Sequence, residues 1–253
     1  MLNYKKFVAK YFPVALQAHI LTVRSRRREK AFGYLPPYIA RDRNSIDIGA
    51  NRGIYTRFLA KRTRHVYAYE PNAAMEPYLR AGMPSNVSVK MIALSDHEGQ
   101  EDLFIPIGRD GRDLISVAKL GDDFGDEEYR GRVRHVPVPV KTLDSENLEN
   151  VGFIKIDVEG FEWDVIRGGE ALIARDRPVI FCEVEQRHLS FPVDDFFTYM
   201  QNLGYRPVFF DDAGLHEIAE FSVERHQNRT PPANDVAPRP YINNFLFIPQ
   251  NVS

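Results

Sequence analysis

The sequence has 253 residues, of which 43% are hydrophobic, enough to bury the core of one main domain. Its 33 basic and 35 acidic residues nearly cancel, which argues against a nucleic-acid-binding protein with a broad basic surface. The single cysteine, Cys182, cannot form an intramolecular disulfide and favours a reducing compartment. No stretch has the roughly 18 uninterrupted apolar residues of a membrane span, and we expect no cleaved signal peptide.

Residues 1–38 are predicted to form a helical extension that is both apolar and basic, with eight Lys or Arg and one acid in residues 1–30. Two interpretations stay open: the apolar side packs on the main domain, or the segment contacts an anionic membrane surface. Because Pro13 interrupts the amphipathic stripe, packing is favoured. The expected location is the cytoplasm, with the inner face of the membrane as the alternative.

Residues 39–253 are predicted to form an α/β domain. Five short runs typical of strands are SIDIGA (45–50), HVYAYE (65–70), VSVKMIAL (87–94), FIKIDVE (153–159) and VIFCEVE (179–185). Helix-like segments follow most of them, at 54–64, about 72–80, 161–176 and 193–204. Two further strands are expected at 205–210 and 244–249. This alternation predicts a mostly parallel sheet with helices on both faces.

An insertion at about 106–137 interrupts the alternation. It is rich in Gly, Arg and Asp and has too little apolar periodicity for a core element, so we expect a substrate-facing region. Its arginines are Arg109, Arg112, Arg130, Arg132 and Arg134. They either bind an acidic sugar or a phosphate-bearing glycan or are neutralised by the acids interleaved with them, and the second interpretation is favoured.

The first predicted strand runs into a turn, SIDIGANRG, at the edge where open parallel sheets bind ligands. A dinucleotide fingerprint would read G-x-G-x-x-G, and Asp47 beside the turn would oppose a pyrophosphate. S-adenosylmethionine carries an ammonium and a sulfonium and no phosphate, so Asp47 favours that ligand. Gly49 and Gly53 allow close backbone approach, and Asn51 is a residue type that tolerates positive φ.

The ends of the second and third strands supply further cofactor contacts. Glu70 lies 23 residues after Asp47 and can accept hydrogen bonds from both ribose hydroxyls. The alternatives are a turn-capping role for Asp47 and a solvated strand end for Glu70. Asp96 either reaches an adenine amino group or caps its own turn. The complete predicted cofactor set is Asp47, Gly49, Asn51, Gly53, Tyr55, Thr56, Glu70, Pro71, Asn72, Ala93, Leu94, Ser95 and Asp96.

Together with MIALSDHEG, VKTLDS and FIKIDVEGFEWDVIRGG, these motifs resemble the FkbM family of S-adenosylmethionine-dependent methyltransferases over residues 45–185. The most specific part is IDVEGFE after a TLD segment. The resemblance implies a class I methyltransferase (Rossmann-like) sheet of seven strands, the last antiparallel. It also implies O-methylation of a hydroxyl on a sugar, polysaccharide, glycolipid or glycosylated natural product. Carried over by motif, the cofactor residues are Asp47, Gly49, Asn51, Gly53, Glu70, Ala93 and Leu94.

A sugar hydroxyl is a poor nucleophile near neutral pH, so a base or a metal should remove its proton as the new bond forms. Asp157 ends the fourth strand, where the methyl group must point, and Glu159 follows in the next turn. The candidate bases are Asp157, Glu159, Glu185 and His188, with the first two preferred. Three alternatives stay open: Asp157 positions the cofactor, Glu159 caps the next helix, or His188 is an exposed loop residue.

A metal is the alternative to a base. Asp157, Glu183, Glu185 and His188 would form an oxygen-rich Mg²⁺ site, but no ligand motif of fixed spacing supports it, so no metal is predicted. Lys155 is expected to pair with the acids beside it. Two other functions stay open: a methyltransferase-fold binding module without catalysis, and a methyltransferase acting on another small molecule, RNA or protein. Nucleic acid is disfavoured because the N-P-P-Y motif of base-methylating enzymes is absent.

Overall fold

The computed structural model describes residues 29–108, 111, 113–114, 118–120, 132–228 and 241–250, together with residues 13, 14, 16 and 20. The predictions for residues 1–28 fall almost entirely outside this part of the chain. Arg109, Arg112 and Arg130 of the insertion also lie outside it. Among the described residues, no helix combines the length and the apolar character that crossing a membrane requires.

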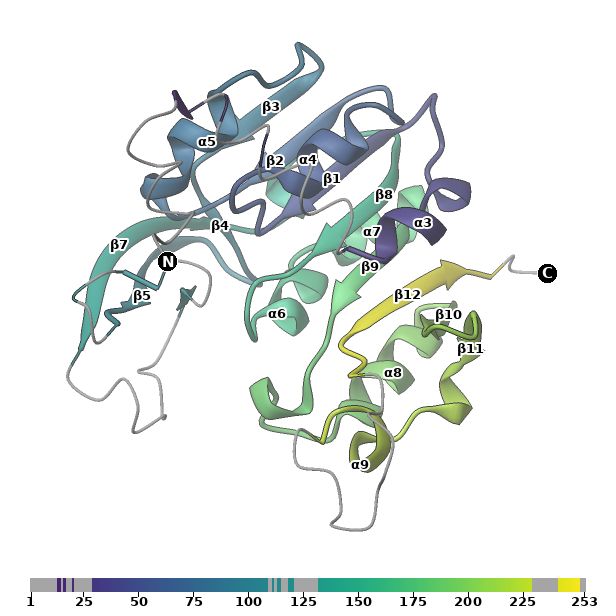
Figure 1. The fold of residues 1–253 in the computed structure, drawn as a ribbon. Coiled ribbons are helices and arrows are strands. Elements are labelled where there is room, and N and C mark those ends of the chain that lie inside the picture. The colour runs from purple at the N-terminus through teal and green to yellow at the C-terminus, as the bar shows by residue number, and fades with distance from the viewer. Residues whose placement is uncertain are drawn as a thin grey trace.

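The strands of the main sheet are β1 (Asn44–Ile48), β2 (Val66–Tyr69), β3 (Val87–Lys90), β8 (Val151–Ile156), β9 (Val179–Glu183), β10 (Tyr205–Phe210), β11 (Leu215–Glu217) and β12 (Asn244–Pro249). Within the described residues this sheet has eight strands, in the order β11-β10-β12-β9-β8-β1-β2-β3 (Figure 1). The strands β3, β2, β1, β8 and β9 run parallel, whereas β12 is antiparallel to both β9 and β10. The predicted mostly parallel sheet with an antiparallel last strand is confirmed, and β11 adds one antiparallel edge strand.

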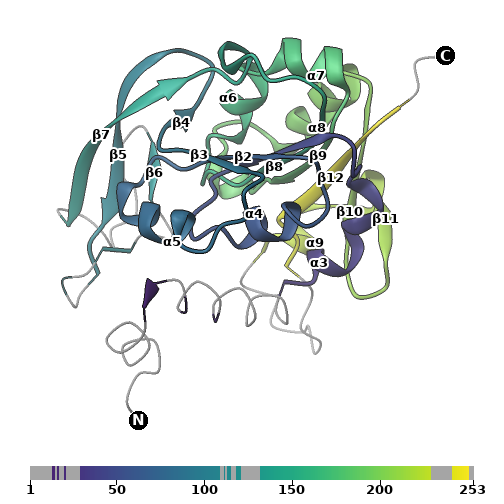
Figure 2. The ribbon, with the colours of Figure 1, turned by 90° about the horizontal axis from the view of Figure 1, so that it is seen from above.

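The α-helices are α3 (Ala31–Tyr34), α4 (Ile54–Leu59), α5 (Glu76–Arg80), α6 (Glu162–Arg167), α7 (Glu170–Asp176), α8 (Val193–Asn202) and α9 (Val223–His226). Short 3₁₀ turns are η1 (Pro36–Tyr38), η2 (Ala73–Met75), η5 (Asp144–Glu146), η6 (Gln186–His188) and η7 (Ile218–Glu220). Figure 2 shows α3, α4 and α5 on one face of the main sheet and α6, α7 and α8 on the other. The predicted three-layer arrangement is therefore confirmed.

The helix predicted at 161–176 is interrupted by a glycine pair. A Cβ on Gly168 would lie 2.0 Å from the carbonyl oxygen of Ser95, and a Cβ on Gly169 would lie 2.8 Å from the Leu143 side chain. The two glycines therefore permit the segments around Ser95 and Leu143 to approach the helical layer, and α6 and α7 form as separate helices. The helix predicted at 54–64 likewise ends early, at Leu59.

Apolar spacing explains how the layers pack. In α8 the residues at i, i+3, i+4 and i+7 are apolar and buried, which gives the helix one face for the sheet. That face is formed by Val193, Phe196, Phe197 and Met200. On the sheet, Ile154 and Ile180 pack toward α6–α8, whereas Phe153 and Phe181 pack toward α3 and α4. Adjacent residues of β8 and β9 thus fill opposite cores, as buried parallel strands require.

A second sheet contains β4 (Ala93–Leu94), β5 (Gly99–Pro106), β6 (Lys119–Leu120) and β7 (Val133–Lys141). Among the described residues it has four strands, in the order β4-β7-β5-β6. The single strand predicted at 87–94 is wrong in this respect: its first half is β3 of the main sheet, and its last residues pair with β7. Because β5 and β7 pair across a long interval, local pattern alone does not reveal their partnership.

The expectation that the insertion lacks core elements is also wrong. Leu120, within the insertion, is 6% exposed and packs with the buried Leu103 and Ile105 of β5. For Arg134 the interpretation of neutralisation by an interleaved acid is confirmed, because its guanidinium pairs with Asp113 at 2.8 Å. The insertion thus contributes a packed wall as well as charged residues.

Candidate active site

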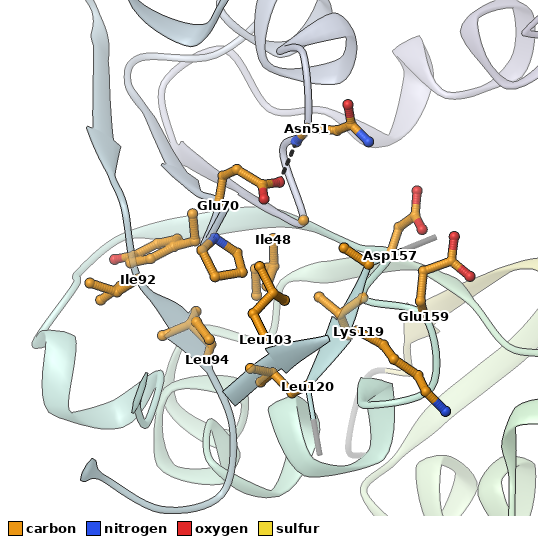
Figure 3. Close-up of a pocket in the computed structure, with 16 residues that line it drawn as sticks. Ile48, Asn51, Glu70, Ile92, Leu94, Leu103, Lys119, Leu120, Asp157 and Glu159 are labelled. Atoms are coloured by element: carbon orange, nitrogen blue, oxygen red, sulfur yellow. Dashed lines mark hydrogen bonds between the residues drawn. The ribbon is translucent and has the colours of Figure 1, made fainter. Parts of the chain in front are cut away.

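A pocket opens between the carboxyl ends of the main-sheet strands and the second sheet (Figure 3). Of the residues predicted to bind the cofactor or to act as base, those in the wall are Gly49, Asn51, Glu70, Pro71, Ala93, Leu94, Asp157 and Glu159. The structure therefore brings together residues from the ends of the first four predicted strands.

The loop after β1 depends on left-handed backbone conformations. Gly49, Asn51 and Gly53 have φ values of 74°, 48° and 73°. A Cβ on Gly49 would lie 1.8 Å from the carbonyl oxygen of Asp157, so only glycine allows the two strand ends to approach this closely. Asn51 adopts the positive φ that its residue type predicted.

Glu70 at the end of β2 faces the pocket from a buried position, 7% exposed. Its two carboxylate oxygens accept hydrogen bonds from the backbone N–H groups of Asn51, at 2.7 Å, and Asn72, at 2.8 Å. Burial raises the pKa of Glu70, and the two N–H donors oppose that rise. Each oxygen keeps a further lone pair, so the carboxylate can still accept hydrogen bonds from ligand hydroxyls.

Asp47 lies beneath the pocket and does not line it. It is 0% exposed, and the Thr56 hydroxyl donates a 2.5 Å hydrogen bond to its Oδ2. Its Oδ1 has no hydrogen-bond partner and stands 3.8 Å from Lys155 Nζ. Burial raises the pKa of Asp47 against the influence of Lys155 and Thr56. The expected contribution of Asp47 to a cationic ligand is therefore indirect, through the loop that it supports.

Lys155 connects the strand ends below the pocket. Its Nζ lies 3.1 Å from Asp157 Oδ2 and donates to the carbonyl oxygen of Gly49, also at 3.1 Å. Burial alone would lower the pKa of Lys155, but Asp157 and Asp47 outweigh burial and raise it, so the side chain stays protonated. The pairing predicted for Lys155 is confirmed.

Besides Asp47, six predicted cofactor residues are absent from the wall among the described residues: Gly53, Tyr55, Thr56, Asn72, Ser95 and Asp96. Tyr55 packs on Phe32, with ring centroids 4.9 Å apart, and its ring lies 5.2 Å from Lys155 Nζ. Asp96 pairs with His97 at 3.0 Å. These side chains support the loops that border the pocket, and the interpretation of Asp96 as a local turn residue fits better than adenine contact.

Eight wall residues were missed by sequence reasoning: Ile48, Tyr69, Ile92, Leu103, Ala118, Lys119, Leu120 and Val158. Figure 3 shows Leu103 and Leu120 of the second sheet facing the same space as Leu94. The alternation of Leu103 and Ile105 in β5 was a readable signal for a strand. Leu120 gave no such signal, because β6 has only two residues.

The turn after β8 presents Glu159 to the pocket. Glu159 has a φ of 56°, and burial followed by the nearby charge of Asp157 raises its pKa to about 7. Helix α6 has no side-chain cap hydrogen bond among the described residues, so the capping role considered for Glu159 is not observed. The carboxylate of Glu162 accepts hydrogen bonds from the N–H groups of Val158 and Gly160.

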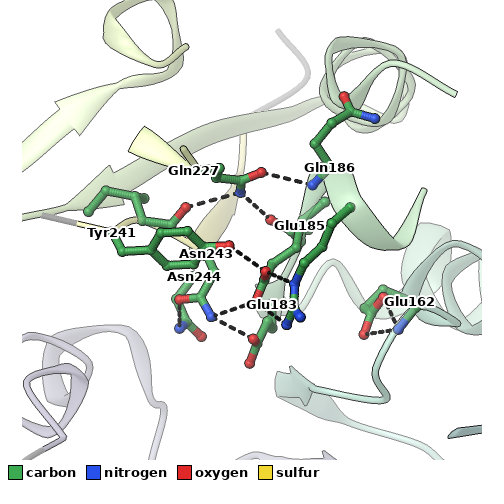
Figure 4. A network of polar contacts seen from close by, with 12 residues as sticks. Glu162, Glu183, Glu185, Gln186, Gln227, Tyr241, Asn243 and Asn244 are labelled. Carbon is green, nitrogen blue, oxygen red and sulfur yellow. Dashed lines mark hydrogen bonds and ion pairs between the residues drawn. The ribbon is translucent and has the colours of Figure 1, made fainter. Parts of the chain in front are cut away.

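The acids at the end of β9 form a separate network (Figure 4). Glu185 accepts hydrogen bonds from Tyr241 at 2.5 Å and Asn243 at 3.3 Å, and it also pairs with Arg187. Although burial favours a higher value, the hydrogen bonds from Arg187 and Tyr241 lower the pKa of Glu185 to about 2. Burial, and then Asp157, raise the pKa of Glu183 to about 10. Neither side chain lines the pocket.

His188 is the remaining candidate base. A Cβ on Gly160 would lie 3.3 Å from His188 Cβ, so η6 packs against the turn that carries Glu159. His188 is not among the pocket residues. Within the described part of the chain, no three or more His, Cys, Asp or Glu side chains are arranged to hold a metal ion. The alternative magnesium set is therefore not assembled as one site.

The family model described as "Methyltransferase FkbM domain" matches residues 47–207. The chain belongs to the FkbM methyltransferase family. The predicted resemblance is confirmed, and the fold belongs to the α/β class that it implied, with small differences in the number and order of the strands. None of the curated proteins compared with this FkbM methyltransferase matches it.

Several solved structures are similar to this FkbM methyltransferase. Methyltransferase FkbM from Methylobacillus flagellatus is 15% identical with a TM-score of 0.49, covering 81% of this chain and 43% of that one. SMU.1697c, a putative methyltransferase from Streptococcus mutans in complex with SAH, is 11% identical with a TM-score of 0.43, covering 87% and 94%. Precorrin-6y C5,15-methyltransferase from Geobacter metallireducens is 10% identical with a TM-score of 0.41, covering 86% of each chain. The chain thus spans less than half the length of the Methylobacillus flagellatus protein.

Proposed function

We propose that this FkbM-family chain is an S-adenosylmethionine-dependent O-methyltransferase that acts on a hydroxyl of a sugar or glycan. The observation that carries the proposal is Glu159, a carboxylate whose pKa of about 7 suits proton removal, at a pocket built from the predicted cofactor loops. A general base works best when its pKa is close to the operating pH.

The pocket suits a cationic ligand. Its charged wall residues within the described part of the chain are Glu70, Asp157, Glu159 and Lys119. Three acids against one lysine would oppose a pyrophosphate and favour a sulfonium and an ammonium. Bound S-adenosylmethionine would supply a methyl group on a positively charged sulfur, which makes the methyl carbon electrophilic without further activation.

Each part of the wall has a task in this proposal. Glu70 would accept hydrogen bonds from the two ribose hydroxyls, because its oxygens keep lone pairs beside Asn51 and Asn72. Leu94, Leu103 and Leu120 would enclose the adenine ring between the two sheets. The loop at Gly49 lets the backbone approach the methionine portion. All of these residues bind and orient the donor.

The carboxylates after β8 divide the remaining work. Asp157 is paired with Lys155, which fixes its orientation and keeps it from serving freely as a base. Among the described residues no ion pair is formed by Glu159, although the Arg187 charge acts on it, and Glu159 would remove the proton from the acceptor hydroxyl. General-base assistance of this kind contributes about 10²–10⁴ in rate.

Calorimetry tests the donor assignment. S-adenosylmethionine should bind the intact chain more tightly than NAD does, and Glu70→Ala should weaken that binding at least about tenfold, because two hydrogen bonds to a charged group are lost. Glu76→Ala is the control, since Glu76 pairs with Arg80 on the surface of α5. Tighter binding of NAD would overturn the donor assignment, and unchanged affinity in Glu70→Ala would remove Glu70 from the ribose site.

A label-transfer assay tests the acceptor. The chain is incubated with methyl-labelled S-adenosylmethionine and a panel of methyl glycosides, oligosaccharides, RNA and protein, and the labelled product is identified by mass spectrometry. Label on a saccharide oxygen is expected. Label on RNA or protein would overturn the acceptor class. Donor binding without any transfer would favour a binding module that has lost catalysis.

A further inference from the structure

We propose that Glu162 is a positioning residue: its buried carboxylate holds the turn at 158–160 so that Glu159 faces the pocket. The inference rests on the proposed function, in which Glu159 is the base. Glu162 begins α6 and is 1% exposed, so it cannot contact an acceptor itself. Any effect on methyl transfer must therefore pass through the turn.

The hydrogen bonds of Glu162 flank Glu159 on both sides. Oε1 accepts from the backbone N–H of Val158 at 3.0 Å and from that of Gly160 at 3.2 Å. Oε2 accepts from the same Gly160 N–H at 3.0 Å. A single side chain thus binds the residue before and the residue after the base, which restricts the backbone rotations that would turn Glu159 away.

The backbone of Glu159 requires such support. Its φ of 56° lies in the left-handed region, which is unfavourable for a residue with a Cβ. A residue persists in that region only when its surroundings hold it there. Gly160, with a φ of 110°, continues the turn in a conformation that suits glycine, and His188 packs against it from the opposite side. The turn is therefore held by Glu162 below and by η6 outside.

The motif DVEGFE acquires a separate role for each acid. Asp157 pairs with Lys155, Glu159 lines the pocket, and Glu162 binds the turn from beneath. The cost of burying a carboxylate at Glu162 is visible in its pKa, which burial raises to about 7 against the hydrogen bonds from the backbone. A position that retains an acid under this penalty has a task, and the geometry makes that task the conformation of Glu159.

An acceptor-independent test follows the titration of Glu159 by carbon NMR of protein labelled on glutamate carboxyls, with Glu159→Gln used to assign the signal. Glu162→Ala frees the turn, so the pKa of Glu159 should fall from about 7 toward its ordinary value of 4.5. Glu162→Gln is the charge-matched control, because it removes the same charge and keeps an oxygen that can accept from both N–H groups. Asp164→Asn controls for a charge change elsewhere on α6.

The comparison of the two variants decides the matter. A larger fall in the pKa of Glu159 in Glu162→Ala than in Glu162→Gln supports a positioning role. Equal falls in that pKa would show that only charge couples the two residues and would overturn the proposal. Calorimetry with S-adenosylmethionine verifies that each variant keeps the donor pocket. If Glu162→Ala does not fold, Glu162→Asp takes its place, because its carboxylate is one methylene shorter and withdraws from the N–H groups of Val158 and Gly160. A Glu159 pKa unchanged from wild type in that variant would overturn the proposal.

Kinetics with the saccharide found in the label-transfer assay give the second test. Glu162→Ala should lower kcat about 10- to 100-fold, a part of the general-base contribution, and leave KM for S-adenosylmethionine within about twofold. In a Glu159→Gln background the same substitution should have no further effect. If the two substitutions instead lower kcat by factors that multiply in the double variant, the positioning role is overturned. Full activity of Glu159→Gln would instead overturn the base assignment itself, so the two failures are distinguishable.

Discussion

Two pairs of acids lie at the ends of neighbouring parallel strands: Asp157 and Glu159 after β8, and Glu183 and Glu185 at the end of β9. Their surroundings give the two pairs opposite roles. Glu159 follows β8, lines the pocket and has its pKa raised to about 7 by burial and by Asp157. Glu185 follows β9, lies outside the pocket wall and has its pKa lowered to about 2 by Arg187 and Tyr241. In sequence the two are both acids just past a buried strand. The hydrogen-bond donors that reach each carboxylate decide which one can accept a proton at neutral pH.

The donors of the β9 network come from far along the chain. Tyr241 and Asn243 precede β12, which lies beside β9 in the sheet. They satisfy Glu185 and fasten the start of β12 to the end of β9. In the described part of the chain, the cation that pairs with Asp157 is Lys155, which comes from β8 itself. The acids at the end of β9 therefore stabilise the sheet, and the acids after β8 are available for chemistry.

The largest expected effect is on catalysis. Glu159→Gln should lower the methyl-transfer rate by about 10²–10⁴, because an amide cannot accept the hydroxyl proton. In the wild type the rate should rise with pH through about 7, since the ionised carboxylate is the active form. The rate is measured by label transfer to the saccharide acceptor. A Gln variant with unimpaired turnover would show that the two acid pairs do not differ in the proposed way.

The next effect is on stability. Glu185→Ala should lower the free energy of unfolding by about 3 kcal/mol, because Arg187, Tyr241 and Asn243 lose their common acceptor in a buried network. Denaturant unfolding followed by circular dichroism measures it. The control is Glu217→Ala, which removes an exposed partner of Arg206 and should change stability by less than about 1 kcal/mol. Equal losses in the two variants would refute the assigned role of Glu185.

A smaller effect concerns pH. The folded-state pKa of Glu183, about 10, exceeds its ordinary value of 4.5, so folding favours its protonated form. Its stabilising contribution is complete below about pH 4.5 and declines as the pH rises toward about 10. Glu183→Gln removes this titration, so its melting temperature should fall less between about pH 6 and pH 9 than that of the wild type. If the melting temperatures of Glu183→Gln and the wild type fall by the same amount over this pH range, the protonated state of Glu183 is contradicted.

The smallest expected effect is at His188. Its side chain packs against Gly160 outside the pocket wall, so His188→Ala should change the methyl-transfer rate by less than about threefold. The same label-transfer assay measures it. A loss comparable to that of Glu159→Gln would place a base on the β9 side and would reverse the comparison between the two regions.

Local chemistry allowed the correct prediction of much of the fold. Period-two and buried apolar runs located the strands of the main sheet, and the spacing in α8 located its buried face. Asn51 was placed in a left-handed turn from its residue type alone. The second sheet was missed, because β5 and β7 are separated by the insertion and pair through contacts that no local window contains.

The sequence by itself determined the order of strands and helices, the glycine turn after β1 and the set of acids from which the site is drawn, because these follow from side-chain periodicity and backbone preference. Only the tertiary structure decided how those acids divide. It buried Asp47 below the pocket, bonded Glu162 to the backbone of the turn at 158–160, and supplied Glu185 with donors from residues 241–243. The physical reason is that a carboxylate's role depends on burial and on its hydrogen-bond donors, and both arise from segments distant in sequence.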